Sequence, residues 1–563
     1  MVSFILYRMI LSCASKLVLV ALSLIGLSLT THGEDDTLSA DVVVYGDASG
    51  GVMAAVQAAR MGKSVILVSQ YGHLGGLTSS GLGWTDIGND AILGGLSREF
   101  YHRLYKHYQR EDAWKYESRA LFPNKGQGVP ALNAKTELAS TFEPKVAEAV
   151  FDSMVSEAKV VVVRGRLDLK RGVVKEGKRV RAIRLEDGKT IRGKMFIDAS
   201  YEGDLLPGAG VSFVVGRESN AEFNEQGNGI TGPLHGNQLR KGIDPYVVQG
   251  DPSSGLLPGV NKDMGGRIGE GDHRLQAYCY RMVLTDVPEN RLPIPKPAHY
   301  NEADYEILFR LIETGFKGAF FKKTLMPNRK TDGNNIGGFS CDFIGGNYGP
   351  DWNWATLTHD EREQLAAKHR DYQLGMVWTL QHHPRVPEDI RKRTLSWGLA
   401  KDEFTDNSNW PYNLYVREAR RMRSSFVMTE NHCRCRIPVE DPVGMGAYTL
   451  DSHNVQRFVH NGMVQNEGDI QLHLRGRAYG ISYRSLVPKI EECENLLVPW
   501  SLSATHIAFG SIRMEPVFMI LAQSSATAAC MAIDGNIPVQ KVPYGELRAR
   551  LLADGQQIEL NSK

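Results

Sequence analysis

Two uninterrupted apolar runs open the foldable part of the chain. Residues 41–45 (DVVVY) and 64–69 (SVILVS) are short and rich in β-branched residues, which is typical of strands buried on both faces. Between them, the alanine-rich stretch 52–61 predicts a helix that ends near Gly62. Together these segments have the length of one β–α–β crossover. The hydrophobic pattern therefore predicts an α/β fold that begins with two parallel strands.

A second group of apolar segments predicts a hairpin and a late return to the sheet. Residues 180–185 and 190–192 flank Asp187 and Gly188, a pair that is typical of tight β-turns. The hairpin predicts a small antiparallel meander beside the parallel strands. The further expected elements are strands at 194–197 and 495–499, a helix that ends at 526–529, and a last helix at 544–552.

The first residues have the layout of a secretory signal. Arg8 and Lys16 precede the apolar run 17–29, and polar residues 30–36 follow it. We therefore expect residues 1–33 to be a signal peptide that exports the protein to the periplasm or the outside. The alternative is that this segment stays uncleaved as a membrane anchor; after cleavage no membrane span is expected.

The first strand runs directly into a glycine-rich turn, residues 46–51 (GDASGG). Gly46 lets the chain turn off the strand, and Gly51 lets the helix pack close to the sheet. Because backbone N–H groups at a helix start bind diphosphates, the turn predicts a dinucleotide site, the alternative being a tight turn without a ligand. The expected dinucleotide contacts are Gly46, Ala48, Ser49, Gly50, Gly51, Ser69 and Gln70.

Composition narrows the class of protein without naming it. A length of 563 residues with 42% hydrophobic residues is enough for a large core without disulfides. A formal net charge of +1 does not indicate a nucleic-acid or membrane-surface binder. The seven cysteines form no closely spaced run of four, so neither an iron–sulfur cluster nor another metal site is expected. Whether Cys433 and Cys435 are bonded stays open.

Charged residues alternate at 417–421, a pattern of helical spacing. Arg417, Glu418, Arg420 and Arg421 predict a salt-bridged helix face. The alternative interpretation is that these side chains anchor an anionic or polyhydroxylated substrate.

Glycine and hydroxyl residues dominate the segment after the second strand, residues 72–86 (GHLGGLTSSGLGWTD). Residues 198–204 (DASYEGD) follow a predicted strand, and residues 501–506 (SLSATH) and 513–516 (RMEP) follow the last one. In these segments the chain resembles the FAD-dependent oxidoreductase family, which is related to the flavin modules of glutathione-reductase-type enzymes and of heterodisulfide reductase. The resemblance covers nearly the whole mature chain.

The resemblance implies FAD as the cofactor and a two-dinucleotide-binding-type fold. This is an α/β fold with a Rossmann-like FAD-binding domain that carries a β-meander, and with an inserted α+β substrate domain. The FAD-binding domain would comprise residues 38–215 and 480–540, the inserted domain residues 216–479, and a C-terminal helix and tail residues 541–563. The further cofactor contacts that the resemblance implies are Gly75, Gly76, Thr78, Ala199, Ser200 and Ser503.

Flavin would carry the redox step, so the protein must supply an acid or base and orient the substrate. His506 lies in the turn expected to pass the isoalloxazine ring, and His453 follows Asp451, a carboxylate suited to orienting it. Arg513 would face the flavin or a substrate oxygen, where its planar fork suits an anion. The alternative for each histidine is a structural role, and for Arg513 it is an ion pair with Glu515.

These features predict an FAD-dependent oxidoreductase that transfers a hydride to or from flavin N5. The expected substrate is a small polar molecule, and export together with the polar insert suggests a carbohydrate derivative. The other partner would be an electron acceptor that the sequence does not identify. Two alternatives remain: a flavin-dependent isomerase or lyase without net redox change, and a secreted binding protein without cofactor, which Ala48 and Ser69 motivate.

Overall fold

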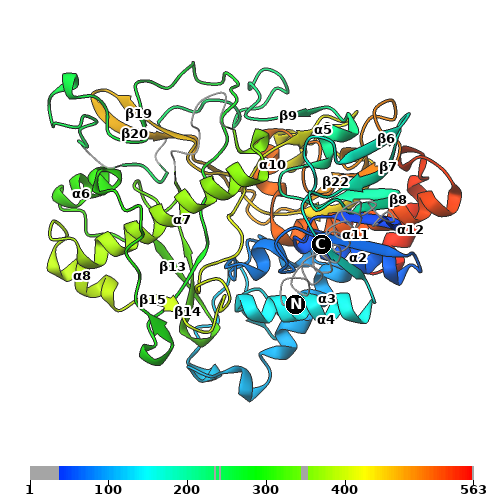
Figure 1. Cartoon of the computed structure of the whole chain (residues 1–563), viewed down its shortest axis with the longest axis horizontal. Coiled ribbons are helices and arrows are strands. Elements are labelled where there is room, and N and C mark those ends of the chain that lie inside the picture. The colour runs from blue at the N-terminus through cyan, green and yellow to red at the C-terminus, as the bar shows by residue number, and fades with distance from the viewer. Residues whose placement is uncertain (1–36, 234–235, 240–241, 344–352, 561–563) are drawn as a thin grey trace, which may run out of the picture.

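The computed structural model describes residues 37–233, 236–239, 242–343 and 353–560 (Figure 1). The expected signal peptide, residues 1–33, lies outside the described residues. In Figure 1 the N-terminal part of the chain, in blue, and the C-terminal part, in red, lie together on one side, whereas much of the middle part, in green and yellow-green, extends to the other side.

A seven-stranded sheet joins the two ends of the described chain. Val42 pairs with Val65 and Val43 with Ile66, so the first two strands are the predicted parallel pair. Within residues 173–198, three consecutive strands pair antiparallel with one another and form a meander. The expected Rossmann-like fold with a β-meander is therefore confirmed. In spatial order the strands are β5 (Val161–Arg164), β2 (Val65–Ser69), β1 (Thr37–Tyr45), β8 (Thr190–Asp198), β7 (Arg179–Arg184) and β6 (Val173–Glu176), with β23 (Leu496–Leu497) beside β8.

Helices α2 (Ser49–Arg60) and α11 (Glu515–Gly535) pack along each other and against β1 and β8. The end expected for this last long helix, 526–529, is wrong: α11 continues to Gly535, where Asn536 caps it with a left-handed φ of 48°. Among the described residues, α11 is long and apolar enough to cross a membrane, but most of it is buried in the core. Around this pair lie α3 (Gly95–His107), α4 (Pro144–Glu157) and α12 (Tyr544–Ala553).

The middle of the chain groups its strands and helices separately, as expected for an α+β insert. A five-stranded antiparallel sheet contains β12 (Arg291–Leu292), β15 (Gly398–Ala400), β11 (Met282–Thr285), β14 (Lys330–Asn334) and β13 (Lys322–Met326). The helices of this part are α6 (Glu306–Glu313), α7 (His359–His382) and α8 (Glu388–Leu395). The domain boundaries expected from the sequence stay a prediction.

Short strand pairs connect the two parts and position the site. Helix α10 (His506–Ile512) packs on β18 (Leu450–Ser452), which pairs with β21 (Ile470–Leu472). The other short elements are β3 (Leu132–Asn133), β4 (Leu138–Ala139), α5 (Leu205–Ala209), β9 (Phe213–Val214), β10 (Val260–Asn261), β16 (Arg421–Met422), α9 (Glu430–Cys433), β17 (Pro442–Gly446), β19 (Gln456–His460), β20 (Met463–Glu467) and β22 (Tyr479–Ser482).

Candidate cofactor and active site

The turn between β1 and α2 is so closely built that its glycine positions have no room for a side chain. Gly46 has a φ of +112°, and a Cβ there would lie 2.5 Å from the carbonyl carbon of Ala199. A Cβ on Gly51 would collide with the carbonyl oxygen of Gly46. Ala48 is the N-cap residue of α2 and makes no side-chain cap hydrogen bond. The start of α2 is therefore suited to an acceptor from outside the helix.

The first turns of α2 and α11 lie side by side. Gly50 faces the carbonyl oxygen of Phe518, from which a Cβ on Gly50 would be 3.2 Å away. Further along both helices, Gln57 donates to the Thr527 hydroxyl over 3.0 Å. The helices are therefore parallel, and the positive ends of both dipoles point to the same place. Two converging helix N-termini favour an anion such as a diphosphate.

A buried carboxyl group, that of Glu515, lies where the two helices begin. The hydroxyls of Tyr201 and Thr78 each donate to it over 3.0 Å, and the Ser49 hydroxyl also donates to it. Burial raises the pKa of Glu515 to about 7, although the three hydroxyl hydrogen bonds act to lower it. Glu515 therefore exchanges a proton near neutral pH at the point where the helix ends converge.

Two cavities adjoin the hydrogen bond between Tyr201 and Glu515, because Tyr201 lines one of them and Glu515 lines the other. The larger cavity, of about 240 Å³, begins at Gln70 after the end of β2. The smaller cavity is bounded by Thr78 and by Tyr415. Thr78 belongs to the segment 72–86, which contains Gly75 and Gly76 and is called the Gly-Gly loop below. One cavity thus lies beside the end of β2, and the other lies between the start of α11 and Tyr415.

His506 is the first residue of α10, and both of its ring nitrogens have partners inside the protein. Nδ1 lies 2.7 Å from Glu418 Oε2, and Nε2 lies 3.1 Å from Ser452 Oγ. The residue is only 3% exposed. Because both nitrogens are already used, this geometry favours the structural role that the sequence left open as an alternative.

His453 stands between two carboxylates at one end of a line of charged groups. Its Nδ1 is 2.8 Å from Asp342 Oδ2, and its Nε2 is 3.5 Å from Asp451 Oδ2. Arg513 donates to Asp451 over 2.8 Å and to the Tyr415 hydroxyl over 2.9 Å. Burial acts to lower the pKa of His453, but the two carboxylates raise it above its usual value. The line thus leads from a titratable histidine to the smaller cavity.

The charged segment 417–421 is extended and buried, so the predicted helix face is wrong. Buried charges need partners, and here the partners come from distant parts of the chain. These contacts also fix the position of Glu418, the partner of His506. Arg417 pairs with Asp342 at 3.0 Å, Arg420 with Asp204 at 2.9 Å, and Arg421 with Glu218 at 2.7 Å.

Comparison with known families decides the class of this site. A sequence model described as "FAD dependent oxidoreductase" matches residues 41–551. The chain belongs to this family. The family and its FAD cofactor, both expected from the sequence, are thereby confirmed. A comparison with curated proteins found no match.

Solved structures resemble parts of this FAD-dependent oxidoreductase. The flavin-containing monooxygenase from Stenotrophomonas maltophilia is 18% identical over 29% of this chain and 38% of its own, with a TM-score of 0.18. The 3-ketosteroid-delta4-(5alpha)-dehydrogenase from Rhodococcus jostii RHA1 is 17% identical over 32% of this chain and 50% of its own, with a TM-score of 0.19. The L-amino acid deaminase from Proteus vulgaris is 18% identical over 34% of this chain and 55% of its own, with a TM-score of 0.20. The chain thus covers little more than half of these proteins at most.

The residues of the glycine turn and around the two helix starts fit FAD. The bend at Gly46 and Gly51 and the two helix starts would hold the diphosphate. The Gly-Gly loop lies directly against this bend, because Gly75 N donates to the carbonyl oxygen of Asp47 over 2.8 Å and a Cβ on Gly76 would come within 3.0 Å of Ala48. Thus the turn and the Gly-Gly loop, which the sequence singled out separately, lie together around one site.

A carboxylate stands near the end of β2, that of Asp47 in the glycine turn. Ser69 Oγ donates to Asp47 Oδ2 over 2.7 Å and accepts from Gly72 N over 3.0 Å. Asp47 also accepts from Tyr71 N over 3.0 Å. Asp47 therefore orders the end of β2 from within the glycine turn, while Gln70 lines the larger cavity. Nothing in the sequence around Asp47 indicates that its carboxylate would order the end of β2.

The three remaining expected cofactor contacts differ in their surroundings. Ala199 packs against the glycine turn. Ser200 Oγ donates to Asp198 Oδ1 over 2.6 Å and so shapes the loop that follows β8. Ser503 Oγ accepts from Ser424 N over 3.1 Å, a contact with the middle segment rather than with the turn.

Glu515 is the main site residue that sequence reasoning missed. The sequence suggests it only as a partner of Arg513, but Arg513 pairs with Asp451 instead. The available signal is its place before Pro516, because proline in the first turn marks the start of a helix. An acidic residue there lies at the positive end of the helix dipole.

Proposed function

We propose that this FAD-dependent oxidoreductase transfers a hydride between the flavin and a small polar substrate, with His453 moving the accompanying proton. The observation that supports this proposal is the charged line from His453 through Asp451 and Arg513 to Tyr415. Tyr415 lines the same cavity as Thr78 and Glu515. A titratable group thereby connects to the region where the flavin end of the cofactor would lie.

Bound FAD supplies the hydride acceptor or donor. The protein's own side chains would orient the substrate and handle its proton. Arg281 is held by Asp332 at 3.2 Å and Arg513 by Asp451 at 2.8 Å, so two fixed guanidinium groups stand near Tyr415. Fixed guanidinium groups hold hydroxyl, carbonyl or carboxylate oxygens in a defined orientation. Neutral His453 would take the proton of the substrate's hydroxyl or amine group when the substrate is oxidised.

A cavity of about 430 Å³ whose lining includes several hydrogen-bonding side chains supports a hydroxylated substrate. It lies beside β21, whose partner β18 carries Asp451 and Ser452. Asp469 lines it, is only 7% exposed and has one carboxylate oxygen without a partner among the described residues. The cavity is also lined by Arg434 and by the amide and hydroxyl residues Asn220, Gln226, Asn228, Thr231 and Gln471. A carbohydrate derivative fits this chemistry, and export through residues 1–33 belongs to the same proposal.

Anaerobic reduction of the flavin tests the proposal. The purified holoenzyme is mixed with sugars, polyols and hydroxy acids, and the flavin absorbance is followed. With a substrate we expect lasting bleaching, and His453→Asn should slow bleaching about 100-fold while FAD content stays unchanged. Because the pKa of His453 is raised, the wild-type rate should increase with pH through a value above the ordinary histidine pKa, and the variant should lack this increase.

The matched control is His460→Asn, because His460 is an exposed histidine at the end of β19. Its bleaching rate and pH profile should equal those of the wild type. Turnover without lasting bleaching would contradict the proposal in favour of an isomerase or lyase. An unchanged rate and pH profile in His453→Asn would contradict the role of His453.

A further inference from the structure

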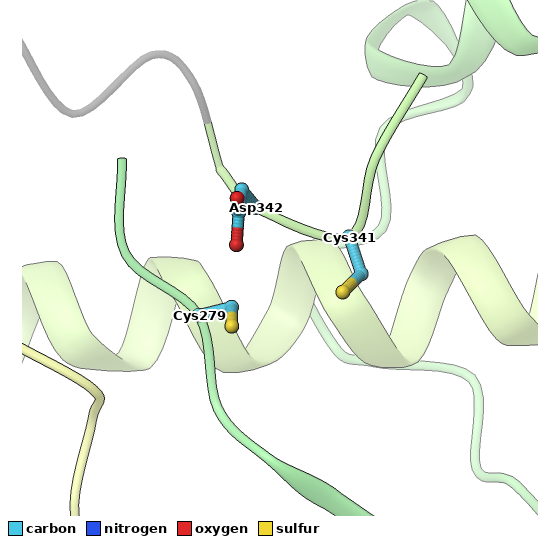
Figure 2. A group of neighbouring side chains, drawn as sticks. All are labelled: Cys279, Cys341 and Asp342. Carbon is cyan, nitrogen blue, oxygen red and sulfur yellow. The ribbon is translucent and has the colours of Figure 1, made fainter. Parts of the chain in front are cut away.

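Two buried cysteines, Cys279 and Cys341, face each other in the middle segment. Figure 2 shows their sulfur atoms and the carboxylate of Asp342 pointing into one common space. These atoms lie within 4.8 Å of one another, and both cysteines are fully buried. A backbone hydrogen bond of 3.1 Å from Phe343 N to Tyr278 O holds the two chain segments together beside the sulfurs. The fold itself therefore brings the two thiols together.

A metal ion does not suit this cluster. Two sulfurs and a carboxylate would be reasonable ligands for a divalent cation. However, Arg417 Nη2 lies 3.2 Å from Cys279 Sγ and 3.0 Å from Asp342 Oδ1. A metal ion bound to these atoms would meet a positive charge at close range in a buried site. The guanidinium group already supplies the charge that these ligands need.

The two thiols differ in their readiness to ionise. Burial acts to raise the pKa of Cys279, but the hydrogen bond from Cys341 and the charge of Arg417 lower it below its usual value. The same hydrogen bond, together with burial, raises the pKa of Cys341. One sulfur is thus disposed to be a thiolate and the other to keep its proton. Thiol–disulfide exchange uses such a pair, because the thiolate is the attacking species.

We propose that Cys279 and Cys341 form a dithiol–disulfide site that exchanges with small dialkyl disulfides and thiols. All six described cysteines are free thiols, including Cys433 and Cys435, so the structure describes the reduced state of this site. The proposal concerns a chemical modification and does not depend on the substrate of the flavin.

The exchange balances in two steps. The Cys279 thiolate attacks one sulfur of the dialkyl disulfide, whose S–S bond breaks and releases one thiolate. Cys341 gives its proton to that thiolate, and its sulfur attacks Cys279 Sγ and releases the second thiolate, which takes a proton from water. The two protein thiols lose two electrons in total, and the dialkyl disulfide is reduced to two thiols. Because both sulfurs are buried, the exchange proceeds through local opening of the structure.

Oxidation would change the surroundings of Arg417. In the reduced state this side chain donates to the carbonyl oxygen of Ala277, to Cys279 Sγ and to Asp342 Oδ1. A disulfide removes the Cys279 thiol group that Arg417 contacts, so that the side chain of Arg417 would rely on Asp342 and on the carbonyl oxygen of Ala277. Asp342 also binds His453. The redox state of the cysteine pair would therefore affect the charged residues from His453 to Tyr415.

Alkylation and peptide mass spectrometry test the site. The full-length holoenzyme is equilibrated with glutathione at increasing ratios of disulfide to thiol, quenched with acid and alkylated. A parallel sample is unfolded and refolded in the same buffers with FAD, so that burial cannot hide the exchange. We expect a cross-linked peptide pair that contains Cys279 and Cys341 and has lost two hydrogen masses, while Cys493 and Cys530 are alkylated as free thiols.

Two kinds of variant serve as controls. Cys530→Ser removes another buried cysteine and should form the cross-link as the wild type does. Cys279→Ser and Cys341→Ser should each abolish it. Alkylation of Cys279 and Cys341 as free thiols in the most oxidising buffer, in both samples, would overturn the proposal. A glutathione adduct on Cys279 without the cross-link would overturn it as well, because Cys341 would then fail to resolve the mixed disulfide.

Discussion

At the scale of single residues, Glu515 combines features that are rarely found together. It is fully buried, it contacts three hydroxyl groups, and the interactions that shift its pKa include no cation. A buried carboxyl group of this kind resists ionisation because the charged form loses its hydration. The charge at the starts of α2 and α11 therefore changes with pH, because Glu515 gains or loses its proton there.

Replacement of Glu515 by glutamine should remove a pH dependence of stability. The folded-state pKa, about 7, lies above the ordinary value of 4.5, so the folded protein holds this proton more tightly than the unfolded chain. The wild type should be fully stabilised by this group below pH 4.5 and lose about 3 kcal/mol as pH rises through 7. Urea unfolding of the FAD-free protein at pH 5 and pH 8 measures this loss.

In Glu515→Gln the corresponding loss should disappear. Glu546→Gln, an exposed glutamate of α12, is the matched control and should behave as the wild type does. Equal losses in the wild type and in Glu515→Gln would show that another group dominates this pH range.

At the scale of elements, β1, its turn and α2 form a unit in which Gly46 and Gly51 of the turn have no room for a side chain. The sequence predicted this unit correctly because its signals are local: apolar strands, glycines at the turn, and an alanine-rich helix. The hairpin at Asp187 and Gly188 was predictable for the same reason, and Gly188 has the positive φ of 93° that such a turn requires. Local pattern therefore accounts for β1, β2, β7 and β23, and the two strands expected at 190–192 and 194–197 form the single strand β8, whereas β5 and β6 were not predicted.

Gly51→Ala should break this unit. Its Cβ would collide with the carbonyl oxygen of Gly46, so the turn must shift. We expect a loss of about 1–3 kcal/mol of stability and loss of bound FAD, because the amide groups of α2 move with the turn. Denaturant unfolding and the flavin absorbance of the purified protein measure both effects.

Gly545→Ala is the matched control for this change. Gly545 lies in the first turn of α12, where an added Cβ would meet nothing within 4 Å. This variant should keep its FAD and gain up to about 1 kcal/mol of stability. Normal FAD content in Gly51→Ala would argue against the assignment of the turn to the diphosphate.

At the scale of the whole molecule, the two parts of the chain are joined by buried charges. Arg362 of α7 makes two hydrogen bonds of 2.8 Å to Asp204, which follows β8. Arg420 of the extended segment donates to the same carboxylate over 2.9 Å. Burial acts to raise the pKa of Asp204, but the two arginines lower it to about 2. One carboxylate thus holds two arginines of the middle segment against the sheet.

Asp204→Asn should destabilise the protein by about 3–5 kcal/mol, because two buried guanidinium groups would lose their counter-charge. Glu388→Gln removes an exposed ion pair with Lys392 on α8 and should cost less than about 0.5 kcal/mol. Urea unfolding at neutral pH measures both values. A small effect of Asp204→Asn would mean that the two arginines find other partners.

Long-range pairing also explains what the sequence could not reveal about the site. His506 finds Glu418 across 88 positions and His453 finds Asp342 across 111 positions. Spacing rules describe neighbours along a helix or strand, and they carry no information on such pairs. The charges at 417–421 lie in an extended segment: each has a partner far away in the chain, and Glu418 and Arg421 also pair with each other at 2.7 Å. The chemistry-bearing types were therefore recognisable, but their contacts were not.

The parallel pairing of α2 with α11 has a consequence for biosynthesis. Ser49 and Glu515 are 466 positions apart, and both belong to the same helix junction. A ribosome releases the first half of this junction early and the second half only near the end of translation. A nascent or truncated chain would consequently contain only the α2 half of this junction. Stable binding of FAD would therefore begin only after the finished polypeptide has left the ribosome.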